Sequence, residues 1–147
     1  MAHLSTRHDH KQSGILSNEL VSSMLSREAP TDVKIHNHNI QCIGNLSEHP
    51  GLRKIDIAFN PIVDLRGIDQ CAQLRQLCAY GGGQLSSLQG LEGVKKLEVL
   101  LLHRNAISSL GLSLHNLTKL RELRLDKNTI SHLGTDLTSC TSLRRYE

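Results

Sequence analysis

Two stretches of the chain decide its fold: residues 97–110, with the sequence LEVLLLHRNAISSL, and residues 120–133, with the sequence LRELRLDKNTISHL. In both, apolar residues occupy the first, fourth, sixth, eleventh and fourteenth positions, and an asparagine occupies the ninth. The second stretch begins 23 residues after the first. A single unit of this length cannot bury its own apolar face, so a repeated pattern predicts a stack of such units.

The same pattern recurs along most of the chain. Residues 52–65 form a third full copy, in which isoleucine replaces several leucines. The copy that opens at Leu74 has one extra residue and runs through Gly81-Gly82-Gly83 where the asparagine is expected. A degenerate first copy lies around residues 33–43 and has His38 at the asparagine position. Because successive copies start 22 or 23 residues apart up to Leu143, the periodicity indicates a regular array.

The spacing within each copy predicts its local structure. Apolar residues two apart point to one side of an extended strand, and the residues between them point to the other side. The asparagine side chain can satisfy backbone groups that the following turn leaves unpaired. Strands of successive copies would therefore pair in one parallel sheet, with the leucines and isoleucines forming a continuous core behind it.

The consensus L-x-x-L-x-L-x-x-N-x-I-x-x-L and its 22–23-residue period resemble a subfamily of leucine-rich-repeat proteins. That subfamily is typified by the phosphatase-one regulatory subunit, axonemal dynein light chain 1 and the spliceosomal A-prime protein. The resemblance implies an α/β solenoid, a right-handed curved array with a parallel sheet on its concave face and irregular or 3₁₀ segments outside. It also implies a binding protein and not an enzyme, with no cofactor.

The chain divides into three parts on this reading. We expect residues 1–13 to be a flexible leader and residues 14–29 to contain a short helix that caps the first repeat. Ser17 or Asn18 would begin this helix, and Arg27 would lie near its end. About five repeats, with a truncated sixth, fill residues 30–147. No polar capping repeat follows, so either the chain continues in a longer protein or a partner covers that edge.

Composition narrows the class of protein further. The chain has one Phe, two Tyr and no Trp, so leucine and isoleucine must supply the core. A net charge of +3 with scattered charges does not indicate direct binding of nucleic acid. No apolar run is long enough for a membrane span. The four cysteines show no paired spacing, which favours a reducing compartment. We expect a cytoplasmic protein, with the cilium or flagellum, the centrosome and the nucleus left open.

The residues that alternate with the inward leucines predict where a partner binds. Several of them are apolar and fall on three adjacent strands, about 5 Å apart, inside a charged rim, as in many protein interfaces. The predicted partner-binding residues are Phe59, Cys78, Tyr80, Val99, Leu101, His103, Arg104 and Arg124. The alternative is ordinary packing, or a register shifted by one residue at the glycine triplet, which would turn Tyr80 inward.

Other candidate sites are weaker than this patch. His36 and His38 are close in sequence, but no cysteine or acidic ligand joins them, so no metal is expected. Cys71 and Cys140 recur at an equivalent position and are expected in the core. Cys42 and Cys78 are expected to be partly exposed thiols. The glycine triplet lacks the Lys-Ser/Thr of a phosphate loop, and glycine there would permit a positive φ in a turn. No catalytic spacing or small-molecule site is recognisable.

These observations predict an adaptor or scaffold that docks a partner subunit on its concave face. A ciliary, axonemal or other cytoskeletal assembly is the first setting that the resemblance suggests. A phosphatase regulatory subunit and a subunit of an RNA–protein complex, similar to the spliceosomal A-prime protein, are the alternatives. Steeply salt-dependent RNA binding would distinguish the last of these.

Overall fold

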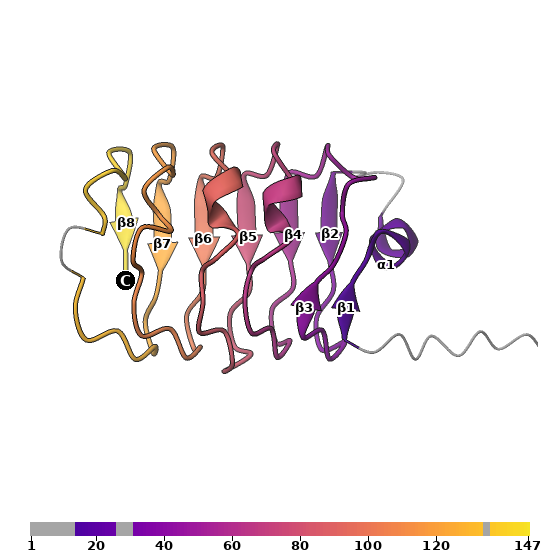
Figure 1. The fold of residues 1–147 in the computed structure, drawn as a ribbon, viewed down its shortest axis with the longest axis horizontal. Coiled ribbons are helices and arrows are strands. Elements are labelled where there is room, and N and C mark those ends of the chain that lie inside the picture. The colour runs from indigo at the N-terminus through magenta and orange to yellow at the C-terminus, as the bar shows by residue number, and fades with distance from the viewer. Residues whose placement is uncertain (1–13, 26–30, 134–135) are drawn as a thin grey trace, which may run out of the picture.

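The structure is a computed structural model that describes residues 14–25, 31–133 and 136–147. The predicted leader, residues 1–13, lies outside the described residues. In the described part of the chain, one short α-helix and two one-turn 3₁₀ segments accompany a row of short parallel strands (Figure 1). None of the helices in this part has the length and apolar character that a membrane crossing requires.

A parallel sheet runs the length of the molecule and confirms the predicted register. Its strands pair in the order in which they occur in the sequence (Figure 1). They are β2 (Asp32–Lys34), β4 (Lys54–Asp56), β5 (Gln76–Cys78), β6 (Val99–Leu101), β7 (Glu122–Arg124) and β8 (Arg145–Tyr146). Equivalent residues of successive repeats lie side by side, as Ile55, Leu77, Leu100 and Leu123 do.

The core lies behind this sheet and consists almost entirely of the repeated leucines and isoleucines. Leu97, Leu100 and Leu102 of one repeat, for example, are each fully buried. Cys71 and Cys140 are also buried, as their position in the repeat predicts. Since a fully buried leucine stabilises a fold by roughly 1.5–3 kcal/mol relative to an exposed one, stacked leucines can replace the missing aromatic core.

The repeated asparagines connect neighbouring repeats behind the strands. The amide nitrogen of Asn60 donates to the carbonyl oxygens of Ile57, in its own repeat, and Ile35, in the preceding one, at 2.9 and 2.7 Å. Its amide oxygen accepts from the backbone N–H groups of His38 and Ile40. Asn105 and Asn128 bond across repeats in the same way. Buried backbone groups at each turn are thereby satisfied.

The glycine triplet takes the place of the missing asparagine. Gly81 and Gly83 have φ values of 78° and 73°, which confirms the predicted positive φ. A Cβ on Gly82 would lie 1.9 Å from the carbonyl oxygen of Asn60. Glycine is therefore required here because the backbone of the preceding repeat occupies the space of any side chain.

The N-terminal end is more elaborate than the sequence predicts. Helix α1 (Asn18–Met24) lies beside β2 (Figure 1), and the Ser17 hydroxyl caps it by accepting from Leu20 N at 3.3 Å. The predicted extent was wrong: the backbone is already extended at Leu25, so the helix ends before Arg27, which lies outside the described residues. Strand β1 (Ile15–Leu16), which the repeat pattern does not predict, pairs with β3 (Cys42–Ile43).

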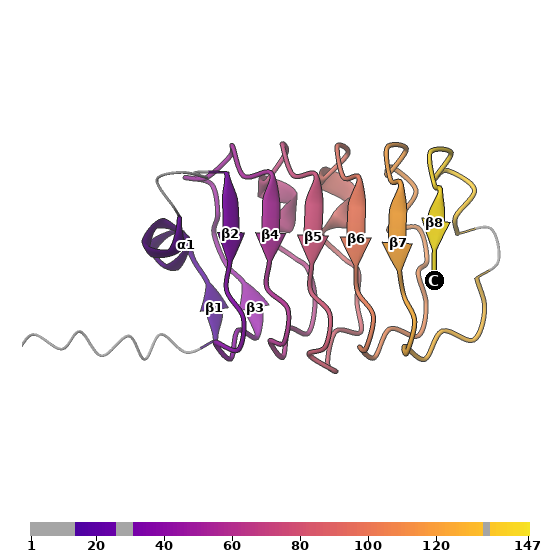
Figure 2. The ribbon, with the colours of Figure 1, turned by 180° about the vertical axis from the view of Figure 1, so that it is seen from behind.

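The opposite side of the core carries the 3₁₀ segments. These are η1 (Ile68–Gln70) and η2 (Leu91–Gly93), and Figure 2 shows them behind the strands. Each is preceded by a glycine in the left-handed region, Gly67 at φ 99° and Gly90 at φ 113°. Because these segments lie on the opposite side of the core, neither of them covers the sheet face that points away from the core, called the sheet face below.

Candidate protein interface

A row of aromatic rings crosses the sheet face just after the strands. If the pairing of β2, β4, β5 and β6 is continued by two residues, His36, Ala58, Tyr80 and His103 occupy equivalent positions. Ala58 has no ring, and the ring of Phe59, the next residue, lies between those of His36 and Tyr80 instead. The four rings of His36, Phe59, Tyr80 and His103 are called the aromatic row below.

The rings of this row contact one another in sequence. His36 and Phe59 meet edge to face with centroids 6.0 Å apart, and Phe59 and Tyr80 do so at 5.2 Å. Tyr80 and His103 stack at 4.4 Å with an interplanar angle of 10°. Each aromatic pair adds roughly 0.5–1.5 kcal/mol beyond its buried area. The row is therefore a preorganised apolar surface, which lowers the ordering entropy that binding requires.

Phe59 is the most exposed ring of the aromatic row, with 45% of its surface accessible. It stands at φ 60° in the left-handed region. The equivalent positions in the other repeats also have positive φ: Asn37, Gly81, Arg104 and Lys127. A non-glycine residue is conformationally strained in this region. The ring of Phe59 lies over Gly81, because a Cβ on Gly81 would meet the ring at 2.8 Å.

The structure places most of the predicted binding residues together on the sheet face. Tyr80, Val99, Leu101 and His103 are half-buried, and Tyr80 points outward in the predicted register, so the one-residue shift does not occur. Val99 and Leu101 lie in β6, directly beside Gln76 and Cys78 of β5. They extend the apolar surface from the aromatic row along the strands.

The prediction that Cys78 is a partly exposed thiol is wrong, because Cys78 is buried, with only 3% of its surface exposed. It lies in a central strand between Asp56 and Leu101, and the side chain of Gln76 covers its sulfur at 3.4 Å. Burial raises the pKa of the Cys78 thiol. Cys78 therefore supports the surface from below. Cys42, by contrast, is exposed as predicted.

Charged residues flank the aromatic row on both sides. On one side, the carboxylate of Asp56 lies 2.7 Å from Nε2 of His36, the first ring of the row. Arg124 is held by Glu147 at 2.8 Å and Asp126 at 3.2 Å, so its charge is already neutralised within the chain. Of these four charged residues, Asp56, Arg124, Asp126 and Glu147, only Arg124 was among the predicted binding residues. His36 was missed because its role depends on contact with Phe59, although its repeat position is visible in the sequence.

His103 occupies an environment that disfavours its charged form. Burial, and then the nearby Arg124, lower the pKa of His103 below the usual value for histidine, while Asp126 opposes them. Arg104 and Lys127 act in the same direction as Arg124. At pH 7 the neutral form of the ring stacked on Tyr80 therefore predominates.

A hollow of about 240 Å³ lies at the end of the row. It is lined by Phe59, Tyr80, His103, Arg104, Arg124, Asp126 and Lys127. Lys127, which was not among the predicted binding residues, belongs to it because it repeats the left-handed position of Arg104 one repeat later. This hollow joins the aromatic rings to a group of basic side chains.

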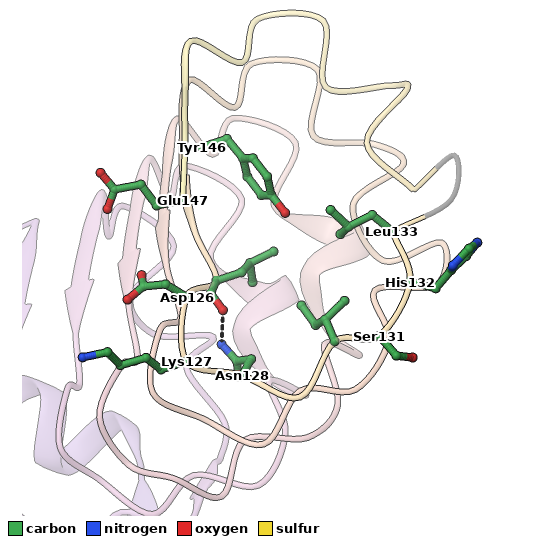
Figure 3. Close-up of a pocket in the computed structure, with 10 residues that line it drawn as sticks. Asp126, Lys127, Asn128, Ser131, His132, Leu133, Tyr146 and Glu147 are labelled. Carbon is green, nitrogen blue, oxygen red and sulfur yellow. Dashed lines mark hydrogen bonds between the residues drawn. The ribbon is translucent and has the colours of Figure 1, made fainter.

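A second hollow, of about 450 Å³, opens at the last strand (Figure 3). Leu125, Ile130, Leu133 and Tyr146 form its apolar lining, and Tyr146 and Leu133 face one another across it (Figure 3). Tyr146 pairs in register with the core residue Leu123. The hollow is therefore the open end of the stacked core, and its apolar character follows from the repeat.

The described residues offer little for metal or thiol chemistry. Within residues 14–25, 31–133 and 136–147, no group of three or more His, Cys, Asp or Glu side chains could hold a metal ion. Burial raises the pKa of Cys71 to about 11, and burial raises the pKa of Cys140 as well. Such thiols are poor nucleophiles at neutral pH.

Comparisons with known proteins identify the fold. No protein-family model and no curated protein sequence matches the chain, but many solved structures do. A Drosophila melanogaster SNF/U2A′ complex contains a chain that matches 90% of this protein and is itself covered over 82% of its length, with 23% identity and a TM-score of 0.71. Since identity is low, this likeness shows the fold alone.

Two further matches are leucine-rich-repeat proteins from distant organisms. One from Leptospira interrogans has a TM-score of 0.75 with 16% identity over 90% of this chain. The leucine-rich-repeat ectodomain of the receptor kinase SOBIR1 from Arabidopsis thaliana has a TM-score of 0.59 with 20% identity over 78% of this chain. The chain spans about a third of the Leptospira protein and 66% of the plant ectodomain. The chain is a leucine-rich-repeat solenoid.

Proposed function

We propose that this protein is a non-enzymatic adaptor that binds a partner protein on its sheet face, through the aromatic row and the adjoining residues of β6. The observation that carries the proposal is the exposure of Phe59 beside Tyr80 and His103. The chain has three aromatic residues other than histidine, and the fold needs none of them for its core. Two of the three, Phe59 and Tyr80, instead contact one another edge to face on the sheet face.

The chemistry of this surface favours a protein partner. Aromatic rings and arginine are enriched at protein interfaces, and a central apolar area with a polar rim is the usual arrangement. Val99 and Leu101 enlarge the apolar centre, and Arg104 lies at the rim. A shallow, open face of this kind does not enclose a small substrate, which supports a binding role over a catalytic one.

Within this class, we propose a ciliary, axonemal or other cytoskeletal assembly in the cytoplasm as the setting, which the repeat consensus favours. A subunit of an RNA–protein complex is the second candidate. It is favoured by the match to the SNF/U2A′ complex, whose matched chain this protein covers over 82% of its length. A phosphatase regulatory role remains a prediction from the consensus.

Quantitative affinity purification tests the binding proposal. The wild type is compared with Phe59→Ala/Tyr80→Ala/Leu101→Ala, after circular dichroism has shown that both are folded. The control is Val63→Ala/Leu112→Ala, which removes apolar residues that are 47% and 83% exposed outside the strands. We expect one set of partners to be lost from the triple variant alone, and their identity decides the setting. Equal recovery from all three proteins would contradict the proposal.

A further inference from the structure

We infer that the segment of the partner that docks here is acidic, with two carboxylates that pair with Arg104 and Lys127 and an apolar side chain that packs on Tyr80. This inference rests on the proposed function and specifies the chemistry of its partner. It follows from the charges around the 240 Å³ hollow at the end of the aromatic row.

Three basic side chains and one carboxylate line that hollow. The carboxylate, Asp126, is paired with Arg124, which also pairs with Glu147. Among the described residues, no carboxylate lies within 4.0 Å of the basic groups of Arg104 or Lys127. Both side chains are exposed. The hollow therefore presents two cations whose charge no carboxylate of the described residues neutralises by direct contact.

The backbone at these two residues supports a role for their side chains. Arg104 and Lys127 stand at φ 59° and 58°, where the equivalent residue of another repeat is Gly81. A side chain carries a conformational penalty in this region, and glycine would avoid that penalty. Glycine would therefore be less strained at both positions, so the fold itself does not require these two basic side chains.

The geometry sets the spacing of the partner's charges. The two cations follow neighbouring strands, which lie about 5 Å apart. Residues four apart on a helix surface have Cβ atoms about 5–6 Å apart. Two acidic residues at positions i and i+4 of a partner helix would therefore face Arg104 and Lys127. An apolar residue one turn further along would then lie over Tyr80.

A nucleic acid fits this face less well than an acidic protein segment. A phosphate backbone carries a charge at every nucleotide and needs a continuous track of cations. Here the hollow that holds Arg104 and Lys127 also holds the carboxylate of Asp126, and Glu147 contacts the Arg124 side chain that lines it. A partner with acidic groups at two points only avoids those carboxylates.

The test is a titration of the ¹⁵N-labelled protein, followed by NMR, with designed alanine-based helical peptides. One peptide carries Leu-x₃-Glu-x₃-Glu, a second carries the same residues in the reverse order, and matched peptides carry glutamine or lysine in place of glutamate. A single-stranded oligouridine RNA is the nucleic-acid probe. The variants are Arg104→Glu/Lys127→Glu and, as a control of equal charge change, Lys95→Glu/Lys119→Glu, which lies outside the strands.

We expect a glutamate peptide to shift the amide resonances of Tyr80, His103, Arg104 and Lys127. Its affinity should fall at least about tenfold with Arg104→Glu/Lys127→Glu and remain unchanged in the control. The lysine peptide should bind the charge-reversed variant, Arg104→Glu/Lys127→Glu, better than it binds the wild type. Raising the salt from about 50 mM to about 300 mM should weaken glutamate binding several-fold.

The contrary results separate this inference from the proposed function. Equal binding of the glutamate and glutamine peptides would overturn the acidic partner but leave a protein-binding aromatic row intact. If the RNA binds the same residues more tightly than any peptide does, the inference that the partner is a protein is wrong. If no peptide shifts any amide of the sheet face, the acidic-segment inference fails, whereas the purification experiment still decides the proposed function.

Discussion

Replacing Asn60 with alanine should be the most damaging change among the repeated asparagines. The Asn60 side chain is 3% exposed and makes five hydrogen bonds to backbone groups, four of them 3.1 Å or shorter. A typical intramolecular hydrogen bond contributes about 1 kcal/mol net. Loss of the four short bonds should therefore lower the free energy of unfolding by about 4 kcal/mol, a large part of the usual total for a domain.

The other asparagines provide a graded comparison. Asn128 makes three such bonds and is partly exposed, so water can replace some of them, and Asn128→Ala should cost only about 1–2 kcal/mol. Asn116 is exposed, and Asn116→Ala should stay within about 0.5 kcal/mol of the wild type. Asn105, 8% exposed, should fall between Asn60 and Asn128.

Urea denaturation followed by far-ultraviolet circular dichroism measures these differences from the midpoint and slope of each transition. The slopes of the variants should equal that of the wild type, so that each change in midpoint reports stability. A loss below about 1 kcal/mol for Asn60→Ala, or an equal loss for Asn60→Ala and Asn128→Ala, would refute the argument that buried cross-repeat hydrogen bonds hold the stack together.

Three further predictions concern the glycine triplet, the thiols and the stacked histidine. Gly82→Ala should destabilise the fold far more than Gly83→Ala in thermal denaturation, because only the first Cβ would meet backbone, at 1.9 Å, whereas nothing lies within 4 Å of the second; equal loss would contradict this. Iodoacetamide should label the exposed Cys42 first and leave Cys71, whose pKa is raised to about 11, unmodified until unfolding; labelling of Cys71 in the native protein, located by peptide mass spectrometry, would count against its burial. Because the pKa of His103 is lowered in the fold, its protonation favours the unfolded chain. Stability should therefore fall as the pH drops from about 6.5 through the lowered pKa, and the loss in urea denaturation should be smaller for His103→Gln; equal pH dependence would contradict the assignment.

The repeat could be predicted from the sequence because its signal is local and occurs many times. Leu97, Leu100 and Asn105 occupy fixed positions relative to one another, and the neighbouring repeats supply the same chemistry at the same spacing. Each further copy therefore fixes the alignment of the repeats more firmly. The structure has the predicted pairing of β5 and β6 even beside the glycine triplet.

The two ends and the fine structure of the face could not be predicted in the same way. Strand β1 pairs with β3, which places Leu16 beside Ile43, a contact between the N-terminal cap region and the irregular first repeat. The burial of Cys78 depends on the Gln76 side chain lying over its sulfur. The stacking of Tyr80 on His103 likewise requires side-chain geometry. Alternation along a strand identifies which side a residue faces, but not which neighbours cover it.

Photo-crosslinking from the aromatic row tests the central claim, that the sheet face is the protein-binding surface, most directly. The crosslinking amino acid p-benzoylphenylalanine, which retains an aromatic ring, replaces Phe59 in one protein and Leu112, 83% exposed, in another. Both are expressed in cells, irradiated and examined for covalent adducts by mass spectrometry. The account predicts a discrete protein adduct from position 59 that is absent from position 112. Adducts from position 112 alone, or the same adducts from both positions, would contradict it.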